Sequence, residues 1–395
     1  MNWFRQLAAL IGFNLRSLPA RRGSAAVAVV GVAGVVAVLV GVLSIGEGFR
    51  RVMTAAGSPD TAIILRGGAD SEMTSVLTRD DVELVRNAPA VARANGEPLA
   101  SPELFVLVDL PKRSTGTEAN VPMRGVRKEA FAVRPEIKIT EGKMFAWGTN
   151  EVIVGHSAQT QFKNTEVGTV LKFGQTRWNV VGVFEGKGGI AESEVWADAA
   201  VLAPAYHRGS SYQTVLVKLA SGGSFQQFKD ALTSDPRLNV KVERETDYYA
   251  AQSRGMRGLV MGLAAIVCSL MGLAAIFGAL NTMYTAVSAR SRDIATLEAL
   301  GFGGGAVMIS VMFEALVLAL LGGIVGAAGA YLAFDGYRSA TMNWQTFSQV
   351  AFAFKVTPSL MIGAILYALF IGLVGGFFPA IRAAKTPVAL ALRDR

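Results

Sequence analysis

Apolar residues in this chain are concentrated in four long runs separated by polar segments. Residues 24–45, 259–280 and 360–378 contain no charged side chain, and residues 306–333 contain a single one, Glu314. At about 1.5 Å per residue, each run can cross a hydrocarbon core of about 30 Å. Because lipid offers no hydrogen-bond partners to the backbone, the runs predict four transmembrane helices, at 24–45, 259–287, 306–333 and 360–378.

The segment ahead of the first run, residues 1–23, alternates apolar and polar positions at helical spacing. This pattern predicts an amphipathic helix in the membrane interface, with a frayed tail as the alternative. A cleaved signal peptide is not indicated, because the apolar run that follows is longer than a secretory core and no small-residue cleavage site is evident.

Basic residues flank the four runs unevenly. They occur before the first run, between the second and third, and after the fourth, whereas the connection between the third and fourth has only Arg338 and Lys355. The positive-inside rule therefore predicts a multi-pass protein of the cell (inner) membrane, with both termini, the segment 288–303 and the tail 379–395 in the cytoplasm. Residues 46–258 and the short loop 334–359 are then extracytoplasmic.

Strand-like and helix-like patterns alternate within residues 46–258. The order strand, helix, strand occurs near both ends of this region, at 61–66, 79–87 and 91–99 and again at 213–219, 224–233 and 238–244. Between them, about 121–205 is strand-rich, with a hairpin pattern at 169–173 and 178–184. The predicted fold is an α-helical membrane protein with four transmembrane helices and a large extracytoplasmic α+β domain, built from two β-α-β units with an inserted β-rich subdomain.

Residues that could carry catalysis or bind a ligand are scarce. His156 and His207 have no partner at ligand spacing, and the glycine-rich segment 186–189 lacks the G-x-x-x-x-G-K-[ST] spacing of a nucleotide-binding loop. The net charge of +8 follows partly from membrane topology, so it does not indicate a nucleic-acid partner. We therefore expect no catalytic residues, no metal site and no cofactor bound by this chain.

Small residues recur four positions apart in the third span, at Gly322 and Gly326, and in the fourth, at Gly372 and Gly376. This spacing allows helix backbones to approach closely in lipid, either within one bundle or between subunits. Because four helices make a thin bundle, we expect a dimer with a second copy of this chain or a homologous chain.

Glu314 is an acidic side chain within the third apolar run. A carboxylate in a membrane is costly and usually faces protein or water. We expect a structural salt bridge with Arg290 or Arg292, with a role in a proton relay as the alternative.

The segment 288–303, SARSRDIATLEALGFG, is strongly charged although it lies between two apolar runs. Ile294, Leu297 and Leu300 recur at helical spacing, and Gly301 is a natural stop. The pattern predicts a short amphipathic cytoplasmic helix. It is either a docking element for a partner or a polar turn at the lipid headgroups.

This segment and the following FEALVLALLGGIVG resemble the signature of FtsX/MacB-type ABC transporter permeases. The ending FPAIRAAKTPVALALR and the stretches EGKMFAWGTNEVIVGHSA and WNVVGVFE also resemble that family. The matching signature positions are Arg290, Arg292, Asp293, Ile294, Ala299, Leu300, Gly301, Glu314, Ala315, Gly322 and Gly323.

The resemblance implies mechanotransmission of the type VII kind. An ATPase subunit, expected as a dimer, would bind ATP and Mg and dock on the coupling helix at 288–303. The second span would continue outward through residues 245–258 as a stalk and carry the motion. The residues expected to couple to the ATPase are Arg290, Arg292, Asp293, Ile294, Leu297, Glu298, Leu300 and Gly301.

The activity implied by the family is export or extraction of a lipoprotein, lipid, peptide or drug at the outer face of the membrane. A periplasmic adaptor or an outer-membrane protein would then be a partner, together with membrane lipids. The alternative is an FtsX-like regulator that transmits ATPase motion to an extracytoplasmic enzyme such as a cell-wall hydrolase.

Overall fold

The computed structural model describes residues 11, 12, 22–55 and 57–385, which form two compact units. The helical unit comprises Met1–Glu47, Leu259–Tyr337 and Phe354–Arg395, and the α+β unit comprises Gly48–Gly258 and Arg338–Ala353. The predicted interfacial helix at 1–23 and the end of the predicted tail at 379–395 lie almost entirely outside the described residues.

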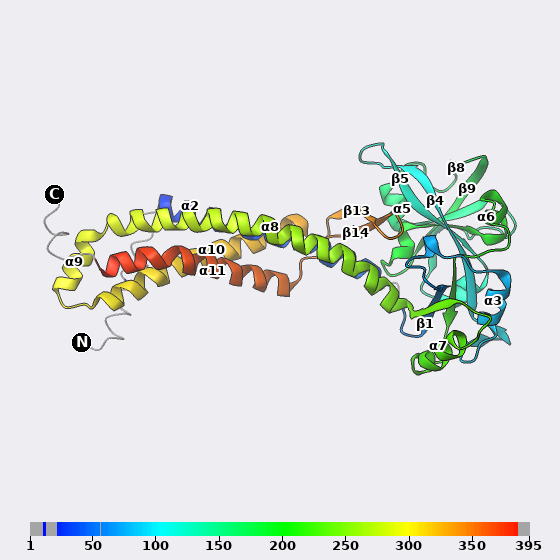
Figure 1. The fold of residues 1–395 in the computed structure, drawn as a ribbon. Coiled ribbons are helices and arrows are strands. Elements are labelled where there is room, and N and C mark those ends of the chain that lie inside the picture. The colour runs from blue at the N-terminus through cyan, green and yellow to red at the C-terminus, as the bar shows by residue number, and fades with distance from the viewer. Residues whose placement is uncertain (1–10, 13–21, 56, 386–395) are drawn as a thin grey trace. The chain divides into compact units, whose positions relative to one another are not determined.

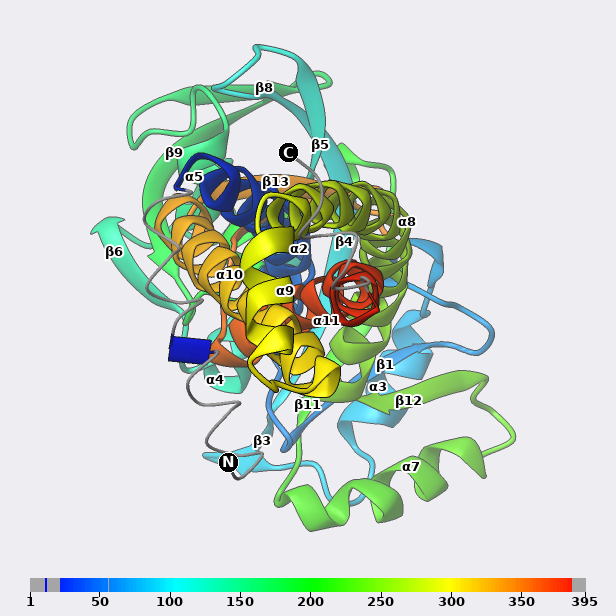
Figure 2. The ribbon, with the colours of Figure 1, turned by 90° about the vertical axis from the view of Figure 1, so that its left-hand side faces the viewer.

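Four helices of the described chain are long and apolar enough to cross a membrane, as the sequence predicts. Figure 2 shows them from the end that carries the short helix α9. All four are longer than the predicted spans, because the helical conformation continues into the flanking residues. They are α2 (Arg22–Ala55), α8 (Glu245–Ser288), α10 (Gly304–Phe334) and α11 (Pro358–Ala384).

Helix α8 is much longer than a membrane requires. Its 44 residues correspond to roughly 66 Å, more than twice the thickness of a hydrocarbon core. The residues from Glu245 to Gly258 belong to the α+β unit, and the apolar stretch from Leu259 onward belongs to the helical unit. One uninterrupted helix therefore contains both the predicted stalk and the second span.

The small residues of the spans pack against neighbouring helices of the same chain. A Cβ atom added at Gly322 would lie 2.8 Å from the carbonyl oxygen of Val29 in α2, and Gly326 likewise faces Ala33. Gly372 and Gly376 of α11 face Ala315 of α10. All four glycines therefore bring helix backbones together within one bundle.

The segment 288–303 is only partly a separate helix. Ser288 is the last residue of α8, and α9 spans Ser291–Ala299, so the independent helix is shorter than predicted. Gly301, with φ +91°, ends it in a Schellman motif: the amide of Phe302 donates to the carbonyl of Leu297, and that of Gly301 to Glu298.

The α+β unit is built on one ten-stranded sheet of order β12-β1-β11-β4-β5-β10-β7-β9-β6, with β8 paired to β9. Its strands are β1 (Thr61–Arg66), β4 (Ala100–Pro111), β5 (Glu118–Val126), β6 (Lys138–Gly142), β7 (Glu151–Gly155), β8 (Val170–Phe173), β9 (Thr176–Glu185), β10 (Val195–Asp198), β11 (Thr214–Lys218) and β12 (Val240–Arg244).

Two β-α-β units are present and interleave, the first with β4 in place of the strand predicted at 91–99. Strand β1 lies antiparallel to both β11 and β12, and β11 lies antiparallel to β4. The units β1-α3-β4 and β11-α7-β12 are therefore both split, each with a strand of the other between its own two. Helices α3 (Arg79–Arg86) and α7 (Phe225–Thr233) pack on this part of the sheet through Val85 and Phe228.

The strand predicted at 91–99 is wrong. That stretch forms the two-residue strands β2 (Arg93–Ala94) and β3 (Glu97–Pro98), and the long strand begins afterwards, at Ala100. Asn95 and Gly96, both with positive φ, form the intervening tight turn, which explains why the chain reverses there.

The predicted hairpin of the middle section is present as β8 and β9, but the section at 121–205 is not a separate sheet. Strand β4 pairs with β11 through residues 100–103 and with β5 through residues 104–111, so the insertion continues the same sheet. The insertion also contains the helices α4 (Glu129–Val133), α5 (His156–Gln161) and α6 (Ala199–Ala205).

The connection predicted as a short loop at 334–359 contains a hairpin. Strands β13 (Arg338–Asn343) and β14 (Ser348–Ala353) pair antiparallel and belong to the α+β unit. The amide of Ala351 donates to the Ser193 hydroxyl at 3.0 Å, and the Asn343 side chain donates to Gln252 of α8 at 2.8 Å. The hairpin therefore contacts both the segment that contains Ser193 and the first part of α8, within the α+β unit.

Packing by Gly326 can be tested against a glycine of the same helix. Gly326→Ala would place its methyl group 2.9 Å from Val36 Cβ, so we expect a loss of about 1–3 kcal/mol in the free energy of unfolding. Gly329→Ala is the control, because no atom lies within 4 Å of its added Cβ. Thermal unfolding in detergent measures both, and equal stability of the two variants would contradict this packing.

Candidate functional site

The turn between α8 and α9 is fixed to α10 by a buried ion pair. The Arg290 guanidinium donates to a Glu314 carboxylate oxygen at 2.6 Å, and only 10% and 3% of the two side chains are exposed. Of the two partners that the sequence offered for Glu314, the structure selects Arg290. Because Arg290 is engaged inside the helical unit, its charge stabilises the α8–α9 turn and does not form an open docking surface.

The two sides of α9 differ in their surroundings. Ile294 and Leu297 are partly buried against a cluster that includes Met283 and Val311. Leu300, expected on the same face, is instead 74% exposed. The reason is that it caps the helix and precedes the left-handed Gly301, which turns the chain away.

The outward side of α9 carries mainly polar residues. Arg292 and Asp293 are exposed, and Glu298 is partly exposed. The surface available to a partner on this segment therefore combines Arg292, Asp293 and the apolar Leu300, whereas Arg290, Ile294 and Leu297 hold α9 in place.

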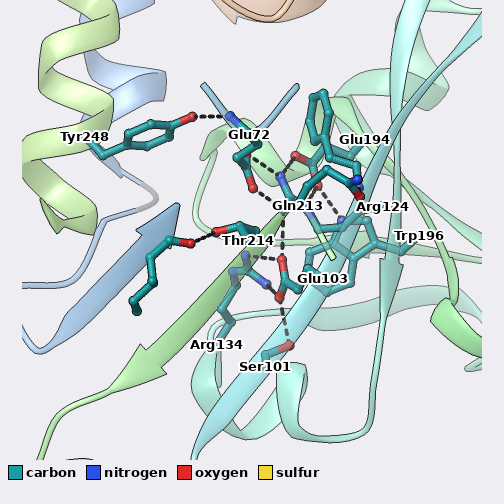
Figure 3. Close-up of polar contacts among 12 residues, drawn as sticks. Glu72, Ser101, Glu103, Arg124, Arg134, Glu194, Trp196, Gln213, Thr214 and Tyr248 are labelled. Atoms are coloured by element: carbon teal, nitrogen blue, oxygen red, sulfur yellow. Dashed lines mark hydrogen bonds and ion pairs between the residues drawn. The ribbon is translucent and has the colours of Figure 1, made fainter. Parts of the chain in front are cut away.

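A second polar constellation lies in the interior of the α+β unit, where Arg124 of β5 binds three carboxylates (Figure 3). Its guanidinium lies 2.7 Å from Glu72, 2.8 Å from Glu103 and 2.7 Å from Glu194. All four side chains are at least 96% buried. Since a guanidinium has five N–H donors in one plane, a single arginine can serve three carboxylates.

Further side chains connect this network to other elements. Arg134, which follows α4, binds Glu103 with two hydrogen bonds of 2.7 and 3.0 Å, and the Trp196 indole donates to Glu194 at 2.7 Å. The backbone amide of Glu72 donates to the hydroxyl of Tyr248 in α8 at 3.1 Å (Figure 3). The network thereby ties both halves of the sheet to the first turns of α8.

The pKa of Glu103 reflects the attraction of the two arginines that contact it. Burial alone would raise this pKa, but Arg134 and Arg124 together bring it below its ordinary value, so the carboxylate stays ionised. Burial raises the pKa of Tyr248 well above its usual range, so its hydroxyl remains neutral. The network is therefore a fixed set of charges and hydrogen bonds at neutral pH.

The backbone amides of the glycine-rich segment 186–189 bind a side chain of the same protein, that of Glu192. The amides of Gly186 and Gly188 donate to one oxygen of Glu192, at 2.8 and 2.6 Å, and the Ser157 hydroxyl contacts the other at 3.3 Å. Its amide groups serve a structural carboxylate, which agrees with the expectation that this segment is not a nucleotide site.

No metal-binding site is indicated in residues 22–55 and 57–385. Among the described residues, no group of three or more His, Cys, Asp or Glu side chains is arranged to hold a metal ion. His156 lies 3.8 Å from Glu185 at the surface.

Models of two known families match the chain. The model described as the MacB-like periplasmic core domain matches residues 25–235, more than half of the chain, and the model described as the FtsX-like permease C-terminal domain matches residues 265–388. The first covers α2 and most of the α+β unit, and the second covers the end of α8 through α11.

Curated relatives align with nearly the whole chain. "Macrolide export ATP-binding/permease protein MacB 1/2" of Paracoccus denitrificans is 25% identical over 98% of this chain and 59% of its own length. "Pyoverdine export ATP-binding/permease protein PvdT" of Pseudomonas entomophila is 25% identical over 92% of this chain and 56% of its own. The chain thus spans less than two thirds of the length of these relatives.

Among solved structures, the periplasmic region of MacB from Actinobacillus actinomycetemcomitans is similar with a TM-score of 0.36 and 14% identity. The match covers 49% of this chain and 92% of that one.

Sequence reasoning found the Arg290–Glu314 pair but missed the Arg124 network. Arg124 and its three carboxylates lie in β5, in β4, immediately before β10 and in the 3₁₀ turn at Glu72–Thr74, so no sequence spacing connects them. A signal does exist, since Glu103 and Arg124 are charged residues whose immediate neighbours in the sequence are mainly apolar. A charge at such a position is stable only if it is paired.

The Arg290–Glu314 pair can be tested by removing one charge. Glu314→Gln leaves Arg290 buried without its counter-charge, so we expect a loss of about 3–5 kcal/mol in unfolding free energy. The double variant Arg290→Met/Glu314→Leu should recover most of that loss. Thermal unfolding of the purified chain provides the comparison, and a single variant as stable as the parent would refute the pairing.

The Arg124 network can be tested against a surface pair of the same domain. Arg124→Gln leaves three carboxylates without their shared cation, so we expect a loss of at least about 3 kcal/mol. Arg113→Gln is the matched control, because its pair with Glu166 is about half exposed and should contribute less than about 1 kcal/mol. Denaturant titration of both variants gives the difference, and similar losses would count against a central role for Arg124.

Proposed function

Because the chain belongs to the FtsX/MacB-like family of ABC transporter permeases, we propose that it transmits the motion of a partner ATPase to its α+β unit. In this proposal α9 is the docking element, α8 is the mechanical link, and the α+β unit acts at the outer face of the membrane. ATP and Mg are bound by the ATPase, expected as a dimer on another polypeptide. The permease itself works as a dimer with a second copy or a homologous chain.

The continuity of α8 is the observation that carries this proposal. The helix begins at Glu245, next to Tyr248 and the Arg124 network, and ends at Ser288, two residues before the buried Arg290. Each end is thus attached to a charge pair or network that resists local rearrangement. A continuous helix with all its backbone hydrogen bonds internal is stiff enough to move as one body.

The distribution of basic residues supports an orientation with α9 and both termini in the cytoplasm. Leu300 then offers an exposed apolar contact on the cytoplasmic side, at the end of a helix that carries the exposed charges of Arg292 and Asp293, and such a surface suits binding of a helix in a groove of the ATPase. Support for a dimer comes from α8, whose apolar stretch has the smallest buried share of the four spans.

We propose export or extraction at the outer face as the activity, with a lipoprotein, lipid, peptide or drug as the cargo class. The names of the relatives, macrolide export and pyoverdine export proteins, favour this over the regulation of a cell-wall hydrolase. An exporter of this kind would work with a periplasmic adaptor or an outer-membrane partner.

Breaking α8 at Gly255 tests the mechanical link. Gly255→Pro removes a helical hydrogen bond and clashes with the preceding turn, at a cost of about 3 kcal/mol, so the helix should kink there. Hydrogen exchange of the complex with its ATPase is then compared with and without ATP. We expect the ATP-dependent change in exchange to persist at α9 and to disappear from the α+β unit.

Gly255→Ala is the matched control, because no atom lies within 4 Å of its added Cβ and alanine favours a helix. It should transmit the ATP-dependent change as the parent does. An undiminished ATP response of the α+β unit in Gly255→Pro would rule out transmission through α8.

A further inference from the structure

The linker that follows α2 packs directly on the first turn of α8. A Cβ atom added at Gly57 would lie 2.8 Å from the Cα atom of Thr246, so only glycine allows the two backbones to come this close. Both segments belong to the α+β unit. They are the places where the chain leaves its first long helix and enters its second.

Two consecutive residues, the last of β12 and the first of α8, hold this linker. Arg244 donates from its guanidinium to the carbonyl oxygens of Pro59, at 2.8 Å, and Gly222, at 2.9 Å. Glu245 accepts a hydrogen bond from the backbone amide of Ser58 at 3.3 Å and is only 2% exposed. The linker is thus bound by two side chains: the guanidinium of Arg244, which is partly exposed to solvent, and the carboxyl group of Glu245, which is buried.

The charges around Glu245 disfavour its ionisation. The adjoining network already contains three carboxylates, on Glu72, Glu103 and Glu194, against two guanidinium groups. Arg134 is the cation that acts on Glu245, but both of its terminal nitrogens are bonded to Glu103.

The remaining groups that face Glu245 add to this effect. Glu136, in the loop after α4, and Glu103, on β4, both repel a negative charge there, and the neighbouring hydroxyl of Tyr249 on α8 is itself buried. An ionised Glu245 would therefore be a further buried negative charge in a cluster that already has an excess of one.

We propose that Glu245 is a proton-operated latch at this junction. In the closed arrangement burial keeps the carboxyl group neutral and the Gly57–Ser58 linker lies against the first turn of α8. Ionisation favours exposure of Glu245 to solvent and so loosens the linker, while Arg244 keeps it attached. Because the α+β unit is proposed to lie outside the cytoplasm, the latch would respond to the pH of the surroundings. The latch itself does not depend on the proposed function.

The pKa of Glu245 agrees with this geometry. Burial raises it from an ordinary 4.5 to about 7. The attraction of Arg134 and the hydrogen bond from the Ser58 amide both oppose the rise, and Glu136 and Glu103 add to it, so burial is the effect that decides the direction. The latched state thus binds the proton more tightly than the open state. Its stabilisation is complete below the ordinary pKa, falls as the pH rises to about 7, and is constant above that.

Amide hydrogen exchange at residues 57–60 of the full chain in lipid nanodiscs tests the latch. With pKa values of about 7 when latched and 4.5 when open, linkage predicts that the protection factor of the Ser58 amide falls about tenfold between pH 6 and pH 8.5. Glu245→Gln, which mimics the neutral carboxyl group, should keep its protection over this range.

Asp247→Asn is the control, since Asp247 is an exposed acid in the first turn of the same helix and should lose protection as the parent does. Loss of protection in Glu245→Gln equal to that in the parent would overturn the proposal. If Glu245→Gln does not fold, the pH dependence of protection in the parent protein decides the question. A fall in protection that levels off near pH 7 supports the latch, and pH-independent protection refutes it.

Discussion

The structure depends on one constraint, that a chain crossing lipid must satisfy its backbone hydrogen bonds internally and therefore stays helical. In α8 this conformation continues well beyond the apolar stretch, over 44 residues from Glu245 to Ser288. A segment that had only to cross the membrane could end after about half that length. The extra turns make one element common to both compact units, and each end of it is held by buried charges.

Those buried charges differ in kind at the two ends. Arg290 and Glu314 form a simple pair, whereas Arg124 serves three carboxylates and is supported by Arg134. Buried ion pairs contribute little net stability compared with apolar packing, but they tolerate few alternative arrangements. They therefore define where α8 begins and ends relative to its neighbours. Glu245, beside the larger network, has no cation dedicated to it and so remains sensitive to pH.

The sequence was most informative where one local pattern decides the structure. Apolar runs predicted the four spans, alternation with a short turn predicted the hairpin β8–β9, and Gly301 marked the end of α9. The split β-α-β order also followed from local patterns. These features depend on neighbours within a few residues, so the reasoning needed no knowledge of distant contacts.

Features that depend on distant contacts were missed. The hairpin β13–β14 was expected to be a loop, because its stability comes from Ser193 and Gln252, more than ninety residues away. The exposure of Leu300 depends on the cap geometry of α9, which helical periodicity does not describe. The Arg124 network combines residues from four separate elements, and only the burial of the strands reveals that their charges must meet.

The central claim is that α8 moves as one rigid helix during the ATP cycle. Pulsed dipolar spectroscopy between spin labels at Asp247 and Thr285, in a Cys268→Ala background, measures this directly in the complex with the ATPase. A continuous helix predicts a separation of about 57 Å between the two backbone positions, the same with and without ATP. A shorter or broader distance distribution in either nucleotide state would show that α8 bends or breaks, and would contradict the account.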